Sequence, residues 1–235
     1  MHLLTLSDLK PIGINKTTSL APIYVQQQFH LLVKQKLMGL PVEPILDNYP
    51  QFQQWIWSLK QLSPSLFIPH KKLKLFVDFP LTAQLECESY RENGTSSGCN
   101  HGIEVRTNVG IVRENPHLFE WGIRHPLLSY SDRIKLWVAT EYFQINPSEM
   151  RLTVLALHPT EAAQKVVFSW DSKQHKRTRN WLIKRINEKI SQPYQPSIAI
   201  PKSNKDMGNI VTPVSDTARA IALVKSIDEI DEVPL

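Results

Sequence analysis

Residues 105–143 carry the pattern that most restricts the fold of this chain. Their sequence is VRTNVGIVRENPHLFEWGIRHPLLSYSDRIKLWVATEYF. It contains two runs of strand-forming residues separated by a turn at residues 114–116, then a loop, then apolar residues at helical spacing. Strand, turn, strand, loop and helix in this order predict a sheet with a helix packed on it. The rest of the chain is interpreted as further elements around this unit.

Two amphipathic helices are predicted before the strands, after a lead-in that is a short strand or irregular. The first helix begins near Pro22 and stops at Gly39, and its apolar residues are Val25, Phe29, Leu32, Val33 and Leu37. The second is capped by Asp47 or Asn48, and its apolar face consists of Phe52, Trp55, Ile56 and Leu59.

The middle and end of the chain predict strands and two more helices. An antiparallel group is expected at LKLFVDF, LTAQLECESY, GIEVRTNVGIV and HLFEW, and two later strands at MRLTVLAL and KVVFSW. Between them a helix at residues 132–143 should bury Ile134, Trp137, Val138 and Tyr142. The basic helix SKQHKRTRNWLIKRINEKI should bury Leu182, Ile183, Ile186 and Ile190. The predicted fold class is α/β, with a mixed central sheet flanked by helices.

Composition predicts one domain with a tail. Residues 1–190 form the domain, 191–213 are rich in proline and predict a linker, and 214–235 carry an apolar helical stripe with an acidic end. This last segment is predicted to dock on the domain or on a protein partner. No apolar run is long enough for a membrane span and no signal peptide is recognisable, so the expectation is a cytoplasmic protein without a membrane partner.

Charge and cysteine content exclude little. A net charge of +5 permits a nucleic-acid partner without requiring one. Cys87 and Cys99 are expected to be free thiols in a reducing cytosol, with a disulfide as the alternative. Two cysteines with only His101 nearby fall short of a structural zinc site, which takes four ligands.

Three segments in order resemble one family. QFHLLVKQKLMGLPVEPILDNYPQFQQWIWSL, VVFSWDSKQHKRTRNWLIKRI and the terminal EIDEVPL resemble the RecB-like PD-(D/E)XK nucleases of bacteria, especially the stand-alone type common in cyanobacteria. The resemblance implies a restriction-endonuclease-like fold. It also implies phosphodiester hydrolysis assisted by Mg²⁺ or Mn²⁺, in which carboxylates hold the metal and a lysine positions the attacking water.

Carried over residue by residue, the resemblance implies a degenerate site. The family histidine matches His30, and the first metal-binding aspartate falls at Asn108. The D/E-x-K strand falls at Glu120 to Gly122, so that its carboxylate is kept and its lysine is lost. The QxxxY pair falls at Ser131 and Lys135. The family's cluster cysteines are absent, so no iron-sulfur cluster is expected.

Loss of a metal-binding carboxylate and of the lysine makes catalysis improbable. Glu120 and Asn108 are thus degenerate catalytic positions, and any Mg²⁺ or Mn²⁺ at His30 and Glu120 is expected to be weakly held or absent. The enzyme alternative is a metal-dependent DNase with migrated residues, in which Arg124, Lys135 or Glu104 substitutes, or Asp78 replaces the aspartate. Simpler interpretations are a hydrogen-bonded interior histidine for His30 and a solvent-facing edge residue for Glu120.

The basic helix is the candidate nucleic-acid interface. Seven cationic residues lie in it against Glu188 alone: Lys173, Lys176, Arg177, Arg179, Lys184, Arg185 and Lys189. Of these Lys173, Lys176, Arg177 and Arg179, together with Arg124, are predicted to contact DNA phosphates; a solvated helix face is the alternative. The expected function is binding to nucleic acid or a partner in DNA repair or recombination. A third hypothesis is a protein scaffold without nucleic acid.

Overall fold

A computed structural model describes residues 2–10, 18–68, 73–90, 96–112 and 114–191. Almost all of the predicted linker, and the whole of the predicted docking segment, lie outside these ranges. Cys87 and Cys99 are register partners in the sheet, but their side chains are not described either, so the thiol prediction remains a prediction. Within the described ranges no helix is both long and apolar enough to cross a membrane.

The described residues form a six-stranded mixed sheet. Its strands are β1 His2–Thr5, β2 Leu73–Tyr90, β3 Ser96–Val112, β4 Asn115–Ile123, β5 Arg151–Leu157 and β6 Gln164–Ser169. The long strand β3 pairs antiparallel with β2 and β4 and parallel with β1. Strand β4 pairs parallel with β5, which pairs antiparallel with β6. The central position of β4 buries the segment that the sequence identifies as the site.

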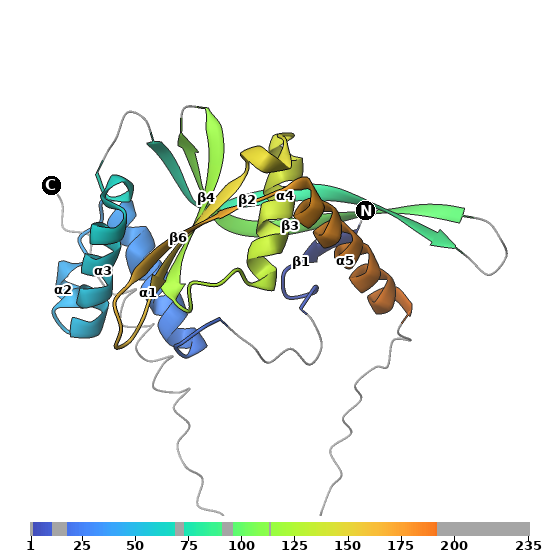
Figure 1. Ribbon diagram of the computed structural model, residues 1–235. Coiled ribbons are helices and arrows are strands. Elements are labelled where there is room, and N and C mark those ends of the chain that lie inside the picture. The colour runs from blue at the N-terminus through green and yellow to red at the C-terminus, as the bar shows by residue number, and fades with distance from the viewer. Residues whose placement is uncertain (1, 11–17, 69–72, 91–95, 113, 192–235) are drawn as a thin grey trace, which may run out of the picture. The chain divides into compact units, whose positions relative to one another are not determined.

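Helices cover both faces of this sheet (Figure 1). They are α1 Ile23–Leu37, α2 Glu43–Leu46, α3 Pro50–Leu62, α4 Tyr130–Phe143 and α5 Ser172–Ser191. One core lies under α1 and α3 and includes Phe29, Trp55 and Trp121. The other lies under α4 and α5 and includes Trp137 and Leu182. The prediction of an α/β fold with a mixed sheet flanked by helices is confirmed.

Local sequence explains where α4 and α5 begin. The Ser129 hydroxyl accepts the Asp132 N–H, and the Asp132 carboxylate accepts the Ser129 N–H, which is a capping box. Asp171 and Gln174 make the same reciprocal pair at α5. These caps fix the entry of two helices that carry candidate functional residues.

A β-bulge interrupts β2 beside the site. The register shifts between Phe76 and Phe79, and Asp78 has a φ of 55°, in the left-handed region. An extra residue of this kind redirects a side chain, and bulges are frequent next to functional sites. Here it turns the Asp78 carboxylate toward α1.

Several expectations were wrong in detail. The two segments LKLFVDF and LTAQLECESY form the single strand β2, because the bulge absorbs the break in their alternation. Tyr142 is 44% exposed rather than buried. The short helix α2 was not predicted. The lead-in does contain a strand, β1, which pairs with β3.

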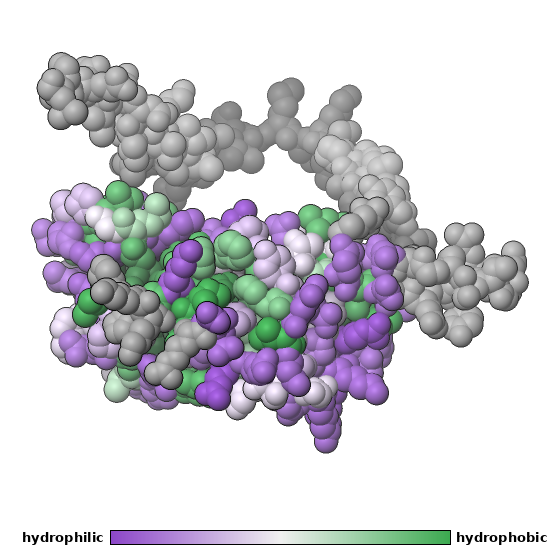
Figure 2. All heavy atoms as spheres, turned by 90° about the horizontal axis from the view of Figure 1, so that it is seen from above, coloured by the Kyte–Doolittle hydropathy of each residue, from purple (hydrophilic) through white to green (hydrophobic). Residues whose placement is uncertain are grey.

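The surface is mixed in character. In Figure 2 hydrophilic residues cover most of the side on which α5 lies, and apolar residues are exposed in patches over the rest of that face. Exposed apolar side chains of α1 and α3 include Tyr24, Leu31 and Trp57.

Candidate functional site

A cavity of about 420 Å³ lies where α1, the β2 bulge, β3, β4 and α4 meet. His30, Asn108 and Glu120 all line it, so the expectation that these three residues share one cleft is confirmed. Asp78 and Lys135, two of the residues considered for a migrated site, also line it. Glu104 and Arg124 do not belong to its lining.

Glu120 is the buried carboxylate of this cleft. It lies on β4 between Phe119 and Trp121, and the residue is only 7% exposed, so the interpretation as a solvent-facing edge residue is wrong. Its Oε1 accepts a hydrogen bond of 3.0 Å from the Thr107 hydroxyl. The same oxygen forms an ion pair with Lys135 Nζ at 2.6 Å. The Lys135 ammonium therefore already neutralises the negative charge that a metal ion would need.

Asn108 holds the sheet together at the bulge. Its Oδ1 accepts the Asp78 N–H at 3.0 Å, and its Nδ2 donates to the Phe119 carbonyl at 3.1 Å. Both ends of the amide are thus engaged with backbone groups of the neighbouring strands. An aspartate could make only the first of these two bonds, since a carboxylate has no N–H to donate. The two bonds at this position therefore require an amide side chain.

Asp78 is the second carboxylate of the cleft and is more exposed than Glu120. Lys34 Nζ lies 3.2 Å and Arg106 Nη1 3.5 Å from its Oδ2. Asp78, like Glu120, therefore faces cationic side chains.

His30 lies on α1 against Trp121, with ring centroids 6.4 Å apart. Burial lowers the pKa of its imidazole, and the negative charge of Glu120 opposes that effect only in part. The ring is consequently neutral at neutral pH. No hydrogen bond joins it to another residue in the described ranges, so the alternative of a hydrogen-bonded interior histidine does not hold there.

Neighbouring side chains fill the space beside Gly122, where the resemblance predicted the loss of a lysine. A Cβ added to Gly122 would lie 3.1 Å from Gln26 Oε1 and 3.6 Å from His30 Nε2. The Gln26 amide is itself fixed, because it donates to the Ile123 carbonyl and accepts the Ile123 N–H. Gln26 thus uses the space that Gly122 leaves.

Arg124 lies at the end of β4 in a neighbouring cavity that also reaches His30 and Glu120. Its guanidinium forms two hydrogen bonds to Asp132, of 3.2 and 2.7 Å. Burial of Asp132 works against ionisation, but the bonds from Arg124 and Ser129 outweigh it and hold the pKa of this carboxyl below its ordinary value. The charge of Arg124 is thus balanced, and its role as a phosphate contact remains a prediction.

The cleft does not fit a divalent cation as its side chains stand. Hard cations prefer several anionic or carbonyl oxygens, whereas here both carboxylates contact ammonium or guanidinium groups and the Asn108 oxygen accepts a backbone N–H. Among the described residues, His, Cys, Asp and Glu side chains form no group of three that could hold a metal ion.

The basic helix α5 divides into two halves. Toward its C-terminus Arg185 contacts Glu188 and the Lys10 carbonyl, and Lys189 contacts Asp8. In the N-terminal half Lys173, Lys176, Arg177 and Arg179 are all exposed. Arg179 also donates to the Glu86 carbonyl at 3.4 Å, and Lys184, further along the helix, lies 4.0 Å from Glu188. The four predicted phosphate contacts of α5 thus all lie in its N-terminal half.

Sequence reasoning missed two residues that line the cleft, Thr107 and Lys34, and one beside it, Asp132, which pairs with Arg124. Thr107, Lys34 and Asp132 were assigned no role, although each bonds a residue that was considered. The S-x-x-D spacing of Ser129 and Asp132 resembles a capping signal, but no local pattern links Thr107 to Glu120 across two strands.

Comparison with known proteins adds no further identification. No protein-family model matches the chain, and no curated protein matches it.

Proposed function

We propose that this chain is a RecB-like protein with a PD-(D/E)XK nuclease fold that no longer cleaves DNA and instead binds nucleic acid during repair or recombination. The parallel pair β4 and β5, joined by α4 and extended by antiparallel β2 and β3, supports the fold. The convergence of His30, Asn108 and Glu120 in one cavity supports the residue correspondence.

The observation that carries the loss of catalysis is the ion pair between Lys135 and Glu120. The ammonium lies 2.6 Å from Glu120 Oε1 and neutralises the charge of this carboxylate, and Thr107 donates to the same oxygen. The Lys135 side chain is 14% exposed and the Glu120 side chain 10%. A metal ion that replaced the ammonium at Glu120 would therefore add the desolvation of a second charge.

Nucleic-acid binding is assigned to the N-terminal half of α5. Its four exposed cations would neutralise phosphates without reading base sequence. For three or four duplex phosphate contacts, the slope of log K against log salt should be roughly −3. The dependence on salt is therefore the diagnostic property.

The test uses the full chain with labelled DNA at several salt concentrations. Reversal of Lys176, Arg177 and Arg179 to Glu should abolish binding, whereas reversal of Lys74, Arg151 and Lys165, three exposed cations on strands, should weaken it far less. Equal losses in both triple variants would mean that net charge alone drives binding. Absence of binding at low salt would refute the proposal.

A second candidate is an active nuclease with migrated residues. It is favoured by the presence of Asp78, Glu120, Lys135 and His30 around one cavity. Incubation with Mg²⁺ or Mn²⁺ should leave linear and single-stranded DNA intact if the first proposal is correct. Metal-dependent cleavage that Glu120→Ala and Asp78→Asn each abolish would establish the second.

A further inference from the structure

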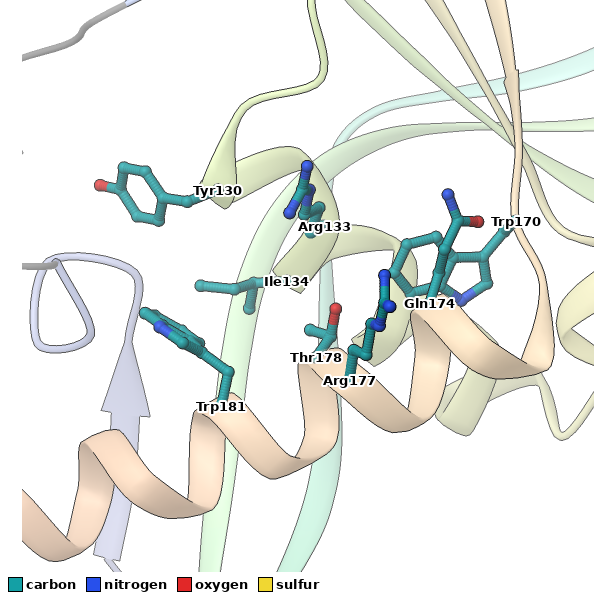
Figure 3. Close-up of a pocket in the computed structure, with 8 residues that line it drawn as sticks. All are labelled: Tyr130, Arg133, Ile134, Trp170, Gln174, Arg177, Thr178 and Trp181. Atoms are coloured by element: carbon teal, nitrogen blue, oxygen red, sulfur yellow. The ribbon is translucent and has the colours of Figure 1, made fainter.

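A second cavity, of about 450 Å³, lies between α4 and α5, outside the cleft (Figure 3). Eight residues line it: Tyr130, Arg133, Ile134, Trp170, Gln174, Arg177, Thr178 and Trp181. Its volume falls in the range of small-ligand sites. Arg177 is the one lining residue that also belongs to the exposed cations of the N-terminal half of α5.

The cavity has two chemically different ends. Figure 3 shows Tyr130, Ile134 and Trp181 at one end, Arg177, Gln174 and Trp170 toward the other, and Arg133 between the two ends. Trp170 is 1% exposed and donates a hydrogen bond of 3.3 Å to His175, so it forms a fixed wall. The lining thus offers aromatic surface beside two guanidinium groups.

The two arginines of the cavity have free charge. Neither Arg133 nor Arg177 makes a side-chain hydrogen bond or ion pair to a residue in the described ranges, and both are exposed. By contrast Arg124 and Arg185 face carboxylates. No lining residue is acidic. Two unbalanced guanidinium groups attract an anion and match phosphate geometry well.

Continuity with the basic half of α5 indicates a polymer rather than a free anion. Arg177 lines the cavity and also belongs to the exposed set with Lys173 and Lys176. A phosphate chain running along α5 would therefore pass the mouth of the cavity. A base beside that chain could stack on the aromatic end, as bases do on aromatic side chains in single-strand-binding proteins.

We propose that this cavity binds one unpaired nucleotide of a single strand, with its base against Trp181 and Tyr130 and its phosphate at Arg133 and Arg177. The proposal rests on the proposed function, because it specifies which form of nucleic acid the α5 surface selects. Bases of an intact duplex are stacked on each other and would have to leave the stack to enter. The cavity should therefore distinguish single strands from duplexes.

The experiment measures binding of a short oligothymidylate and of a short duplex to the full chain. Trp181→Ala should weaken oligothymidylate binding by about 5- to 150-fold, the loss of one base stack, and leave duplex binding unchanged. Trp57→Ala, which removes a 62% exposed tryptophan of α3, is the matched control and should change neither. Urea unfolding of both variants confirms that they are folded.

A second variant keeps the test independent of packing. Arg133→Gln with Arg177→Gln changes only exposed side chains, and it should make the single-strand salt slope less negative by about 0.7, the contribution of the one phosphate that the pair holds. If Trp181→Ala and the arginine pair leave oligothymidylate binding unchanged while the triple reversal in α5 abolishes it, the cavity proposal is wrong and the proposed function stands. Equal weakening of duplex and single strand by Trp181→Ala would also overturn it. If neither nucleic acid binds, the proposed function itself falls.

Discussion

Replacement of Lys135 by methionine tests whether the cleft is a structural ion pair. Lys135→Met keeps most of the side-chain volume and leaves Glu120 with Thr107 as its remaining hydrogen-bond donor. Two unit charges 2.6 Å apart attract each other by about 6 kcal/mol at an effective dielectric constant near 20. Desolvation of both groups on folding consumes much of this attraction, and removal of one partner of a buried pair typically costs about 3–5 kcal/mol.

We therefore expect the free energy of unfolding to fall by about 3 kcal/mol at neutral pH. For a folded region of this size, the loss corresponds to a decrease in Tm of about 6–12 °C. Urea unfolding followed by tryptophan fluorescence measures the change. Lys176→Met on the exposed surface of α5 is the control, and should change stability by less than about 0.5 kcal/mol.

A double-mutant cycle separates the pair from other effects. In Lys135→Met with Glu120→Gln the neutral amide can still accept from the Thr107 hydroxyl, so much of the lost stability should return. A coupling free energy near zero, or a Lys135→Met variant as stable as the control, would refute the reasoning. The carboxylate would then be free for another partner, and the argument for a neutralised site would fail.

Three further predictions concern individual side chains. Asn108→Asp should lower the free energy of unfolding by about 1–3 kcal/mol in urea unfolding, because it places a carboxylate against the Phe119 carbonyl, and a neutral change would contradict the role given to Asn108. Gly122→Lys should not restore cleavage in a DNase assay and should lower the Tm, since its Cβ would meet Gln26; cleavage by the variant would show that the scaffold accepts the family lysine. Burial lowers the pKa of His117 to about 4, and the charges of Arg151 and Lys165 add to the effect. As the pH falls, the imidazole is therefore protonated in the unfolded chain before it is protonated in the folded protein. The free energy of unfolding should consequently fall as the pH drops from about 6.5 to 4. Because the ring is partly solvated, we expect His117 to account for about 1–2 kcal/mol of this loss in the free energy of unfolding. The His117→Gln variant should therefore lose that much less stability than the unchanged protein over the same pH range. His30 contributes a loss in the same direction in both proteins.

The sequence predicts the elements of this fold better than the chemistry of its cleft. Apolar spacing locates α1, α3, α4 and α5, because a helix with one buried face repeats locally. The described strands β2 to β6 also lie at the predicted segments, although two of these segments form the single strand β2. The bulge at Asp78 was not predicted, and Asn108, which accepts a hydrogen bond from the Asp78 N–H, lies thirty positions away in the chain.

The candidate site could be located but not interpreted from sequence. Position-by-position resemblance brings His30, Asn108 and Glu120 to one cavity. It cannot show that Lys135 reaches Glu120 from α4, since that contact depends on how the helix packs on the sheet. It also treats Asn108 as a lost aspartate, whereas the structure gives its amide two partners that an aspartate could not both satisfy.

The extra residue of the β2 bulge allows one strand to serve two cores. Before the bulge Leu73, Leu75 and Val77 pack with the core under α1 and α3; after it Leu81 and Leu85, also odd-numbered, belong to the core under α4 and α5. Alternation alone would have placed them all on one face. A deletion of Asp78 would therefore move each residue of the first part of the strand to the opposite face of the sheet, and so to the other core. The length of this segment is constrained more tightly than its composition, and insertions or deletions there should be tolerated only in pairs.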